Sequence, residues 1–310
     1  MFKNFSFLLI ALFLVSCESD SYDLVIQNGI IYDGSGSDSE SVDIGIIGNQ
    51  IVKVGKINSK NSLKIIDATG LVVSPGFIDT HAHLDPMSNF IKLSHGESHV
   101  RQGVTTSFGG PDGRGVPLKY GFKEFLDSIE KVGVGMNVGF LTGHNKIRRV
   151  VMNLDNRQPT EEELERMKNL ASKAMDEGAF GISTGLKYLP GNFSKVDEVI
   201  EISKEISKKG GVYTSHLRDE GLKIIEAVNE AIKISRDADI SVVLTHHKVI
   251  GKPMWGKSSI TLSLIDSARQ KGIKVMADQY PYNASHTGIN VLIPTWARAG
   301  GSQEFKDRVS

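Results

Sequence analysis

Cysteine is almost absent from this sequence, which contains one, Cys17, in 310 residues. A single cysteine cannot form an intramolecular disulfide, and no other thiol remains for metal binding or covalent catalysis. An excess of either charge is also absent, because 36 Lys and Arg residues balance 36 Asp and Glu residues. Without a long basic run the chain lacks a surface that would follow a phosphate backbone, so nucleic acid is not an expected partner.

Long apolar runs are absent as well, since the most apolar stretch, residues 5–15, is too short to span a bilayer. Lys3 before it and a small-residue site after it are typical of a secretory signal peptide. Residues 14–17, Leu-Val-Ser-Cys, resemble a bacterial lipobox, in which Cys17 is acylated and becomes the mature N-terminus. We therefore expect residues 1–17 to be a lipoprotein signal peptide. The protein would be exported and held on the periplasmic or outer-membrane side by this lipid anchor alone. An ordinary signal peptide cut near Cys17 is the alternative.

Residues 23–74 alternate short apolar segments with turn residues, which predicts a small β domain. Residues 44–47 and 51–54 flank Gly48-Asn49-Gln50, a sequence that favours a β-hairpin loop. This segment is therefore expected to fold apart from the rest of the chain.

From residue 75 onward, apolar segments alternate with helical patterns, which indicates repeated βα units and a parallel sheet. Helices are predicted at 161–177, with Thr160 as N-cap, and at 196–209, before Gly210-Gly211. Seven strands are predicted, around residues 77–81, 105–108, 136–141, 180–183, 212–215, 242–245 and 275–277. Seven is one fewer than a closed (β/α)₈ barrel has, so we expect residues 75–310 to be an incomplete barrel from a longer protein.

Histidines stand at the ends of three predicted strands. His81 and His83 are two residues apart, so in extended backbone both imidazoles point to the same side. His216 and His246 each follow another apolar strand. A lone histidine at such a place more often satisfies a polar turn, but the carboxyl ends of parallel strands meet at one edge. Together these residues indicate a zinc site.

Several motifs, in order along the chain, carry a family resemblance. Residues 75–83, Pro-Gly-Phe-Ile-Asp-Thr-His-Ala-His, resemble the first barrel strand of the amidohydrolase superfamily. The further segments resemble the N-acyl-D-amino-acid deacylase (D-aminoacylase) family and lie at residues 102–106, 143–148, 181–190, 216–220, 245–248 and 280–282. The resemblance implies a (β/α)₈ amidohydrolase barrel with a small β-sandwich, of which residues 23–74 are the N-terminal part. It also implies one or two zinc ions.

One position departs from the pattern of that family. After the second strand the family carries Gly-Asn-Cys-Gly, whose cysteine helps to hold the metal, whereas residues 109–113 here read Gly-Gly-Pro-Asp-Gly. Asp112 stands where the cysteine would, and a carboxylate is a normal zinc ligand. Pro-Asp-Gly is also a good turn without any metal, which is the alternative.

The resemblance implies further site residues. Lys248, with Tyr282 or alternatively Tyr280, would bind the α-carboxylate of the substrate. The aspartate that moves a proton in the family follows the eighth strand and would lie beyond Ser310, so no catalytic residue is assigned.

Three more residues are candidates for substrate contact from their positions. Arg218 could hold a carboxylate by two hydrogen bonds, or it could bridge to neighbouring acids. His144 and Tyr188 fall on loops at the expected active end of the barrel.

These observations predict zinc-dependent hydrolysis of the amide bond of small N-acyl-D-amino acids. Two alternatives remain. Another amidohydrolase would act on a dipeptide or a cyclic amide, and a non-catalytic lipoprotein would only bind a ligand.

Overall fold

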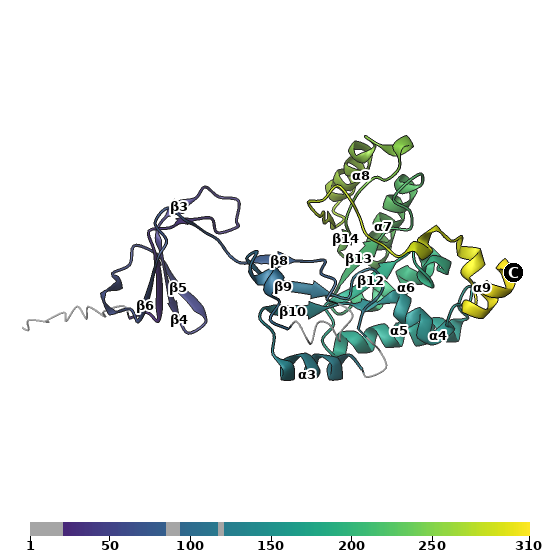
Figure 1. Ribbon diagram of the computed structural model, residues 1–310, viewed down its shortest axis with the longest axis horizontal. Coiled ribbons are helices and arrows are strands. Elements are labelled where there is room, and N and C mark those ends of the chain that lie inside the picture. The colour runs from purple at the N-terminus through teal and green to yellow at the C-terminus, as the bar shows by residue number, and fades with distance from the viewer. Residues whose placement is uncertain (1–20, 85–93, 117–120) are drawn as a thin grey trace, which may run out of the picture. The chain divides into compact units, whose positions relative to one another are not determined.

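The computed structural model describes residues 21–84, 94–116 and 121–310 (Figure 1). Cys17 and the predicted signal peptide lie outside the described residues. Within the described ranges, none of the helices combines the length and the apolar character needed to cross a bilayer. The chain divides into two compact units, Met1–Pro75 and Gly76–Ser310, each with sheets of its own.

The first unit is built from short strands in two sheets. The larger sheet has the order β5-β4-β1-β6, and its outer pair is antiparallel with Asp43 opposite Gly55. This pair is the predicted hairpin, and Gly48 in its turn has a positive φ of 57°, which glycine adopts without steric cost. The smaller sheet has the order β3-β2-β7. The strands of this unit are β1 (Leu24–Gln27), β2 (Ile30–Ile31), β3 (Glu40–Ser41), β4 (Asp43–Ile47), β5 (Gln50–Gly55), β6 (Lys64–Asp67) and β7 (Val72–Val73).

The second unit contains parallel strands in sequence order, and each of the seven predicted strand regions contains one. The third region is split at Leu141, so β10 pairs with β9 whereas β11 pairs with β12. The described strands are β8 (Phe77–Asp79), β9 (Val104–Gly109), β10 (Asn137–Phe140), β11 (Thr142–Gly143), β12 (Gly181–Gly185), β13 (Val212–His216), β14 (Val242–Leu244) and β15 (Val275–Ala277). All pairs are parallel.

These strands form two sheets, β10-β9-β8 and β11-β12-β13-β14-β15. Among the described residues the sheets end at β8 and β15 and do not close into a ring. On β8, Phe77 and Ile78 are each 62% exposed, which marks it as an edge strand with an uncovered apolar face. The incomplete barrel therefore stays a prediction.

Helices connect the strands, as the βα pattern requires (Figure 1). The described helices are α2 (Glu97–Val100), α3 (Phe122–Val132), α4 (His144–Met152), α5 (Glu161–Asp176), α6 (Val196–Ser207), α7 (Ile224–Ala238), α8 (Ser258–Gln270) and α9 (Ser302–Val309). The predicted N-cap of α5 is confirmed, because the Thr160 hydroxyl accepts from the Glu163 backbone N–H and the Glu163 side chain accepts in return. The main apolar core lies between these helices and the five-stranded sheet, around Tyr213, Val242 and Leu244.

Candidate metal centre

The first part of the site comes from the loops after β8 and β9. The Nε2 atom of His81 lies 3.7 Å from Oδ1 of Asp112, and the Nε2 atom of His83 lies 3.3 Å from Oδ2 of the same carboxylate. The backbone N–H of His81 donates to Asp79 at 3.0 Å, which turns the chain as it leaves the strand. Both imidazoles predicted to share a pocket therefore meet one carboxylate.

The loop that carries Asp112 is held in a fixed shape. Asp112 has a positive φ of 56°, a conformation that aspartate tolerates better than most residues. The next residue, Gly113, donates its N–H to the Ser183 hydroxyl at 3.0 Å, and a Cβ on Gly113 would meet the side chain of Asn145 at 2.1 Å. The Ser183 hydroxyl in turn donates to the Gly110 carbonyl at 2.6 Å. The Pro-Asp-Gly turn therefore places the Asp112 carboxylate among the histidines. A turn at this position and a metal ligand at Asp112 do not exclude each other.

The second part of the site comes from the five-stranded sheet. Nδ1 of His216 and Nε2 of His246 each lie 3.6 Å from Oδ1 of Asp112. The two ring nitrogens are 2.7 Å apart, a hydrogen-bond distance. His216 ends β13 and His246 follows β14, with a positive φ of 39°. Segments far apart in sequence thus converge on Asp112.

The spacing of these atoms suits a metal ion. Two nitrogen or oxygen ligands at about 2.0–2.1 Å from a tetrahedral zinc ion lie roughly 3.3 Å apart. Two trios of side chains offer ligand atoms within 4.8 Å of one another: His81, His83 and Asp112, and Asp112, His216 and His246. The Oδ1 atom of Asp112 is buried without a hydrogen-bond partner among the described residues, although three imidazole nitrogens surround it. A cation satisfies such an atom, so the residues fit zinc.

The pKa shifts within the cluster also favour a bound cation. Burial would raise the pKa of Asp112, but the four histidine rings around its carboxylate hold that pKa well below its usual range. Burial would lower the pKa of His81, but Asp112 and Asp278 raise it to about 10. Burial lowers the pKa of His216. The carboxylate therefore draws positive charge into this place, which protons or a metal ion can supply.

Two carboxylates behind the cluster were not predicted from the sequence. Asp278, directly after β15, lies 3.3 Å from Nδ1 of His81 and accepts the backbone N–H of His246. Glu220 lies 2.9 Å from Nδ1 of His246. A carboxylate on the second ring nitrogen fixes the tautomer and the orientation of a ligand histidine. The position at a strand end that indicated His216 and His246 would have indicated Asp278 too, had acids been considered with histidines.

Lys248 lies beside the cluster, as predicted. Its Nζ atom is 2.6 Å from Glu220 and 3.0 Å from Nδ1 of His246, and it lies 5.6 Å from the centre of the Tyr280 ring. Tyr282, the preferred aromatic partner in the prediction, is 73% exposed and stacks on the Tyr280 ring. The structure thus favours Tyr280, the alternative, as the tyrosine next to Lys248.

Arg218 does not reach the metal centre as a substrate clamp. Its guanidinium binds Glu230 through two nitrogens, at 2.7 and 2.9 Å, and donates to the carbonyls of Asn192 and Ser194. The alternative prediction, a bridge from Arg218 to Asp219 or Glu220, is not formed among the residues that the structure describes. These bonds tie the loop after β12 to α7, because a rigid fork can satisfy a carboxylate and two carbonyls together.

His144 was expected to line the pocket, but the structure buries it completely within the fold. Its Nε2 atom lies 2.9 Å from Glu198, and the same carboxylate is bound by the buried guanidinium of Arg148. His144 begins α4 with its ring turned towards α6. It therefore joins two helices instead of contacting a ligand.

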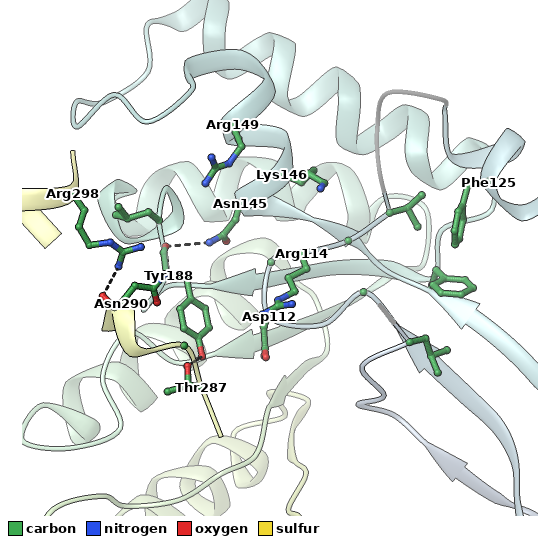
Figure 2. Close-up of a pocket in the computed structure, with 18 residues that line it drawn as sticks. Asp112, Arg114, Phe125, Asn145, Lys146, Arg149, Tyr188, Thr287, Asn290 and Arg298 are labelled. Atoms are coloured by element: carbon green, nitrogen blue, oxygen red, sulfur yellow. Dashed lines mark hydrogen bonds between the residues drawn. The ribbon is translucent and has the colours of Figure 1, made fainter. Parts of the chain in front are cut away.

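Tyr188 lies where it was predicted, against the cluster. Its ring centre is 4.5 Å from that of His216, and its hydroxyl is 3.4 Å from the Thr287 hydroxyl. Tyr188 and Asp112 also line a cavity of about 570 Å³ (Figure 2). The metal centre thus opens into a space large enough for a small ligand.

A profile described as the amidohydrolase family matches residues 64–275, and the chain belongs to this family. The predicted resemblance to N-acyl-D-amino-acid deacylases is confirmed by its relatives. D-aminoacylase of Alcaligenes xylosoxydans xylosoxydans is 35% identical over 290 residues, which are 87% of this chain and 59% of that protein.

Two solved structures extend the comparison. One, described by the binuclear metal centre of D-aminoacylase, has a TM-score of 0.78 and 34% identity, over 84% of this chain and 59% of the other. N-acyl-D-glutamate deacylase of Bordetella bronchiseptica, complexed with zinc and a phosphonate inhibitor, has a TM-score of 0.79 and 30% identity, over 85% and 59%. The chain thus spans about three fifths of the length of these relatives.

Proposed function

We propose that this chain is part of a zinc-dependent hydrolase that cleaves the amide bond of N-acyl-D-amino acids. The observation that supports this most is the Asp112 carboxylate, which two trios of ligand residues share. The relatives support the chemistry and the substrate class, since two of them are a D-aminoacylase and an N-acyl-D-glutamate deacylase. Their metal sites are described as binuclear in one case and as zinc-containing in the other.

The ligand residues would hold zinc, and the other residues would orient them and the substrate. When bound, zinc supplies a Lewis acid that polarises a carbonyl and lowers the pKa of water. Asp278 and Glu220 keep the rings of His81 and His246 aimed at the centre of the cluster. Lys248, 3.0 Å from His246, presents an ammonium group that attracts the α-carboxylate and brings the neighbouring amide close to the ligands.

Zinc content and substrate range test this proposal together. Zinc per chain is measured by atomic absorption, and hydrolysis is measured on a longer form of the protein that includes the predicted eighth strand, with N-acetyl-D-methionine, N-acetyl-L-methionine, a dipeptide and a hydantoin. We expect bound zinc and cleavage of the D-configured acyl amino acid alone. Cleavage of the dipeptide or the hydantoin instead would replace the substrate class, and zinc binding without any cleavage would favour a ligand-binding protein.

The complete barrel belongs to the same proposal. His81 follows β8, the first strand of the second unit, and Asp278 follows β15, the seventh predicted strand. Nδ1 of His81 nevertheless lies 3.3 Å from the Asp278 carboxylate. Ends of strands so distant in order meet when a sheet curves round on itself. We expect a further strand between β8 and β15, and hydrogen–deuterium exchange of a longer form of the protein should show new protection along both strands.

The lipid anchor at Cys17 is the remaining element of the proposal, and its support is the Leu-Val-Ser-Cys motif. Metabolic labelling with a radioactive fatty acid should mark the protein, and Cys17→Ser should abolish the label. Label retained by the variant would remove the anchor.

A further inference from the structure

The cavity beside the metal centre is lined by an unusual number of cations. Four basic residues line it, and among the described residues of its wall the only acid is Asp112, whose carboxylate faces the four histidines. The basic residues are Arg114, Lys146, Arg149 and Arg298. In Figure 2, Arg114 lies beside Asp112, Lys146 and Arg149 extend from α4, and Arg298 belongs to the wall that also carries Thr287 and Asn290.

Three of these cations have no acidic partner. No carboxylate of the described residues forms an ion pair with Lys146, Arg149 or Arg298. The Arg298 guanidinium instead donates to the Asn290 carbonyl, at 3.0 Å. Most basic side chains of the neighbouring helices do pair, as Lys168 does with Glu165 at 2.6 Å. Cations that gather round a cavity and have no acidic partner among the described residues, as these three do, favour an anionic ligand there.

Partial burial increases the energy that Arg298 would gain from an anionic ligand. Arg298 is half-buried, and burial lowers the pKa of its guanidinium, with no acid of the described chain nearby to oppose the effect. A charge that has lost part of its water gains more from an opposite charge than an exposed one does.

This group of cations is separate from Lys248, which does not line the cavity. Lys248 stands on the side of His246 and Glu220, whereas the cavity begins at Asp112 and Tyr188. A substrate whose amide lies at the ligand cluster can therefore place one carboxylate near Lys248 and a second group in the cavity.

From this arrangement we propose that the cavity is a second carboxylate-binding subsite, so that N-acyl-D-amino acids with two carboxylates are the preferred substrates. The proposal rests on the function proposed above and narrows its substrate class. The second carboxylate belongs either to an acidic side chain or to a dicarboxylic acyl group, and the chemistry that recognises it is the same. Apolar residues such as Phe125 and Phe140 line the same cavity and would pack on the methylenes that carry the charge.

Paired substrates that differ only in this charge test the subsite. One arm compares N-acetyl-D-glutamate with N-acetyl-D-glutamine, and the other compares N-succinyl-D-leucine with N-butanoyl-D-leucine. We expect kcat/KM to favour the acid by about tenfold or more in one arm, which identifies where the carboxylate resides, and to lose that preference in high salt. Equal rates for acid and neutral partner in both arms would overturn the proposal.

Variants of the cavity cations give the second measurement. Lys146→Met combined with Arg149→Met should reduce the preference for the acid over the neutral substrate to less than about threefold. Lys271→Met, which removes an exposed cation at the end of α8, is the matched control and should change neither rate. Thermal melting shows that each variant is folded. An unchanged acid preference in the folded double variant would also overturn the proposal.

Binding separates this proposal from the hydrolase function. Isothermal titration with N-acetyl-D-glutamate and N-acetyl-D-glutamine reports the subsite even where nothing is cleaved. Tighter binding of the acid without hydrolysis supports the subsite and removes the proposed reaction. The opposite outcome is that N-acetyl-D-glutamine is hydrolysed as fast as N-acetyl-D-glutamate, with equal affinity for both and no acyl-group preference. That outcome contradicts the subsite and leaves the proposed hydrolysis supported.

Discussion

The two histidine pairs of the metal centre rest on very different supports. His216 and His246 follow neighbouring strands in a five-stranded sheet whose residues are mostly buried, and the His216 side chain is 8% exposed. His81 and His83 follow β8, an edge strand of a three-stranded sheet, and the His83 side chain is 47% exposed. His81 is 11% exposed and His246 is 13% exposed, so the two halves differ mainly at His83. One ring of the edge pair is therefore held more loosely than the other three.

The difference teaches how the centre is assembled. Side chains that packing already holds in place lose little conformational freedom when they bind, so more of the interaction energy appears as affinity. The interior pair meets this condition. The edge pair depends on Asp112 and Asp278, which reach it from other loops. Asp112 belongs to both halves, and zinc affinity is the quantity that should separate their contributions.

Replacing Asp112 should have the largest effect, because both trios lose a ligand at once. For Asp112→Ala we expect zinc affinity to fall by more than about 100-fold, beyond what an outer carboxylate contributes. Competition with a chromophoric chelator measures this.

Asp112→Asn is the matched variant, since asparagine also tolerates a positive φ and keeps the turn. It should lose zinc while it melts close to the unchanged protein. Full zinc content in Asp112→Ala would remove Asp112 from the ligands.

Removing one histidine from each half compares the two supports directly. His216→Ala should weaken zinc binding by about 100-fold, whereas His83→Ala should weaken it by about tenfold, because the interior trio remains. Zinc per chain, measured by atomic absorption, should fall further for His216→Ala. His286→Ala, at an exposed position outside both trios, is the control. Equal losses from both halves would contradict the comparison.

Asp278→Asn tests the support of the edge pair. Without the carboxylate on its Nδ1 atom, His81 is less firmly oriented, and zinc affinity should fall by about tenfold. The control is Asp266→Asn, an exposed acid on α8. A role in folding alone would lower the melting temperature and leave the zinc affinity as it was, and Asp278→Glu should restore part of the affinity.

Glu198 lies behind the interior half and should have the smallest effect on zinc, less than about threefold, because it touches no ligand residue. Glu198→Gln should instead lower the free energy of unfolding by about 3 kcal/mol, since it leaves the buried Arg148 without an ionised partner. Chemical denaturation measures this, with Glu201→Gln on the same helix as a control that costs less than about 1 kcal/mol.

The loss from Glu198→Gln should also depend on pH. Burial would raise the pKa of Glu198, but His144 and Arg148 lower it below its ordinary 4.5. A lowered pKa in the folded state means that the carboxylate stabilises the fold above pH 4.5 and that this contribution is lost as the pH falls through the folded value. The two proteins should therefore converge in stability in acid, and a constant difference from pH 7 to pH 3 would contradict this origin.

Much of this arrangement could be predicted from residues alone. Apolar segments separated by helical patterns predicted the strands, and the N-cap residue Thr160 predicted where α5 begins. Histidines at strand ends predicted the site, because parallel strands bring their carboxyl ends to one edge. The positions predicted for Arg218 and His144 were wrong, because they depend on contacts between distant segments. Their partners, Glu230 and Glu198, lie on helices, and no local pattern shows which side chain faces which.

The sequence by itself determined the alternation of strands and helices, the family and the residue types that bind zinc, since each depends on local periodicity or on motifs in order along the chain. The tertiary structure decided the rest. It brought Asp278 and Glu220 behind the histidines and placed Tyr280 rather than Tyr282 next to Lys248. It also placed three cations that lack an acidic partner among the described residues round one cavity. Such contacts depend on how distant segments pack and on which charges already have a partner, and these properties arise only when the whole chain folds.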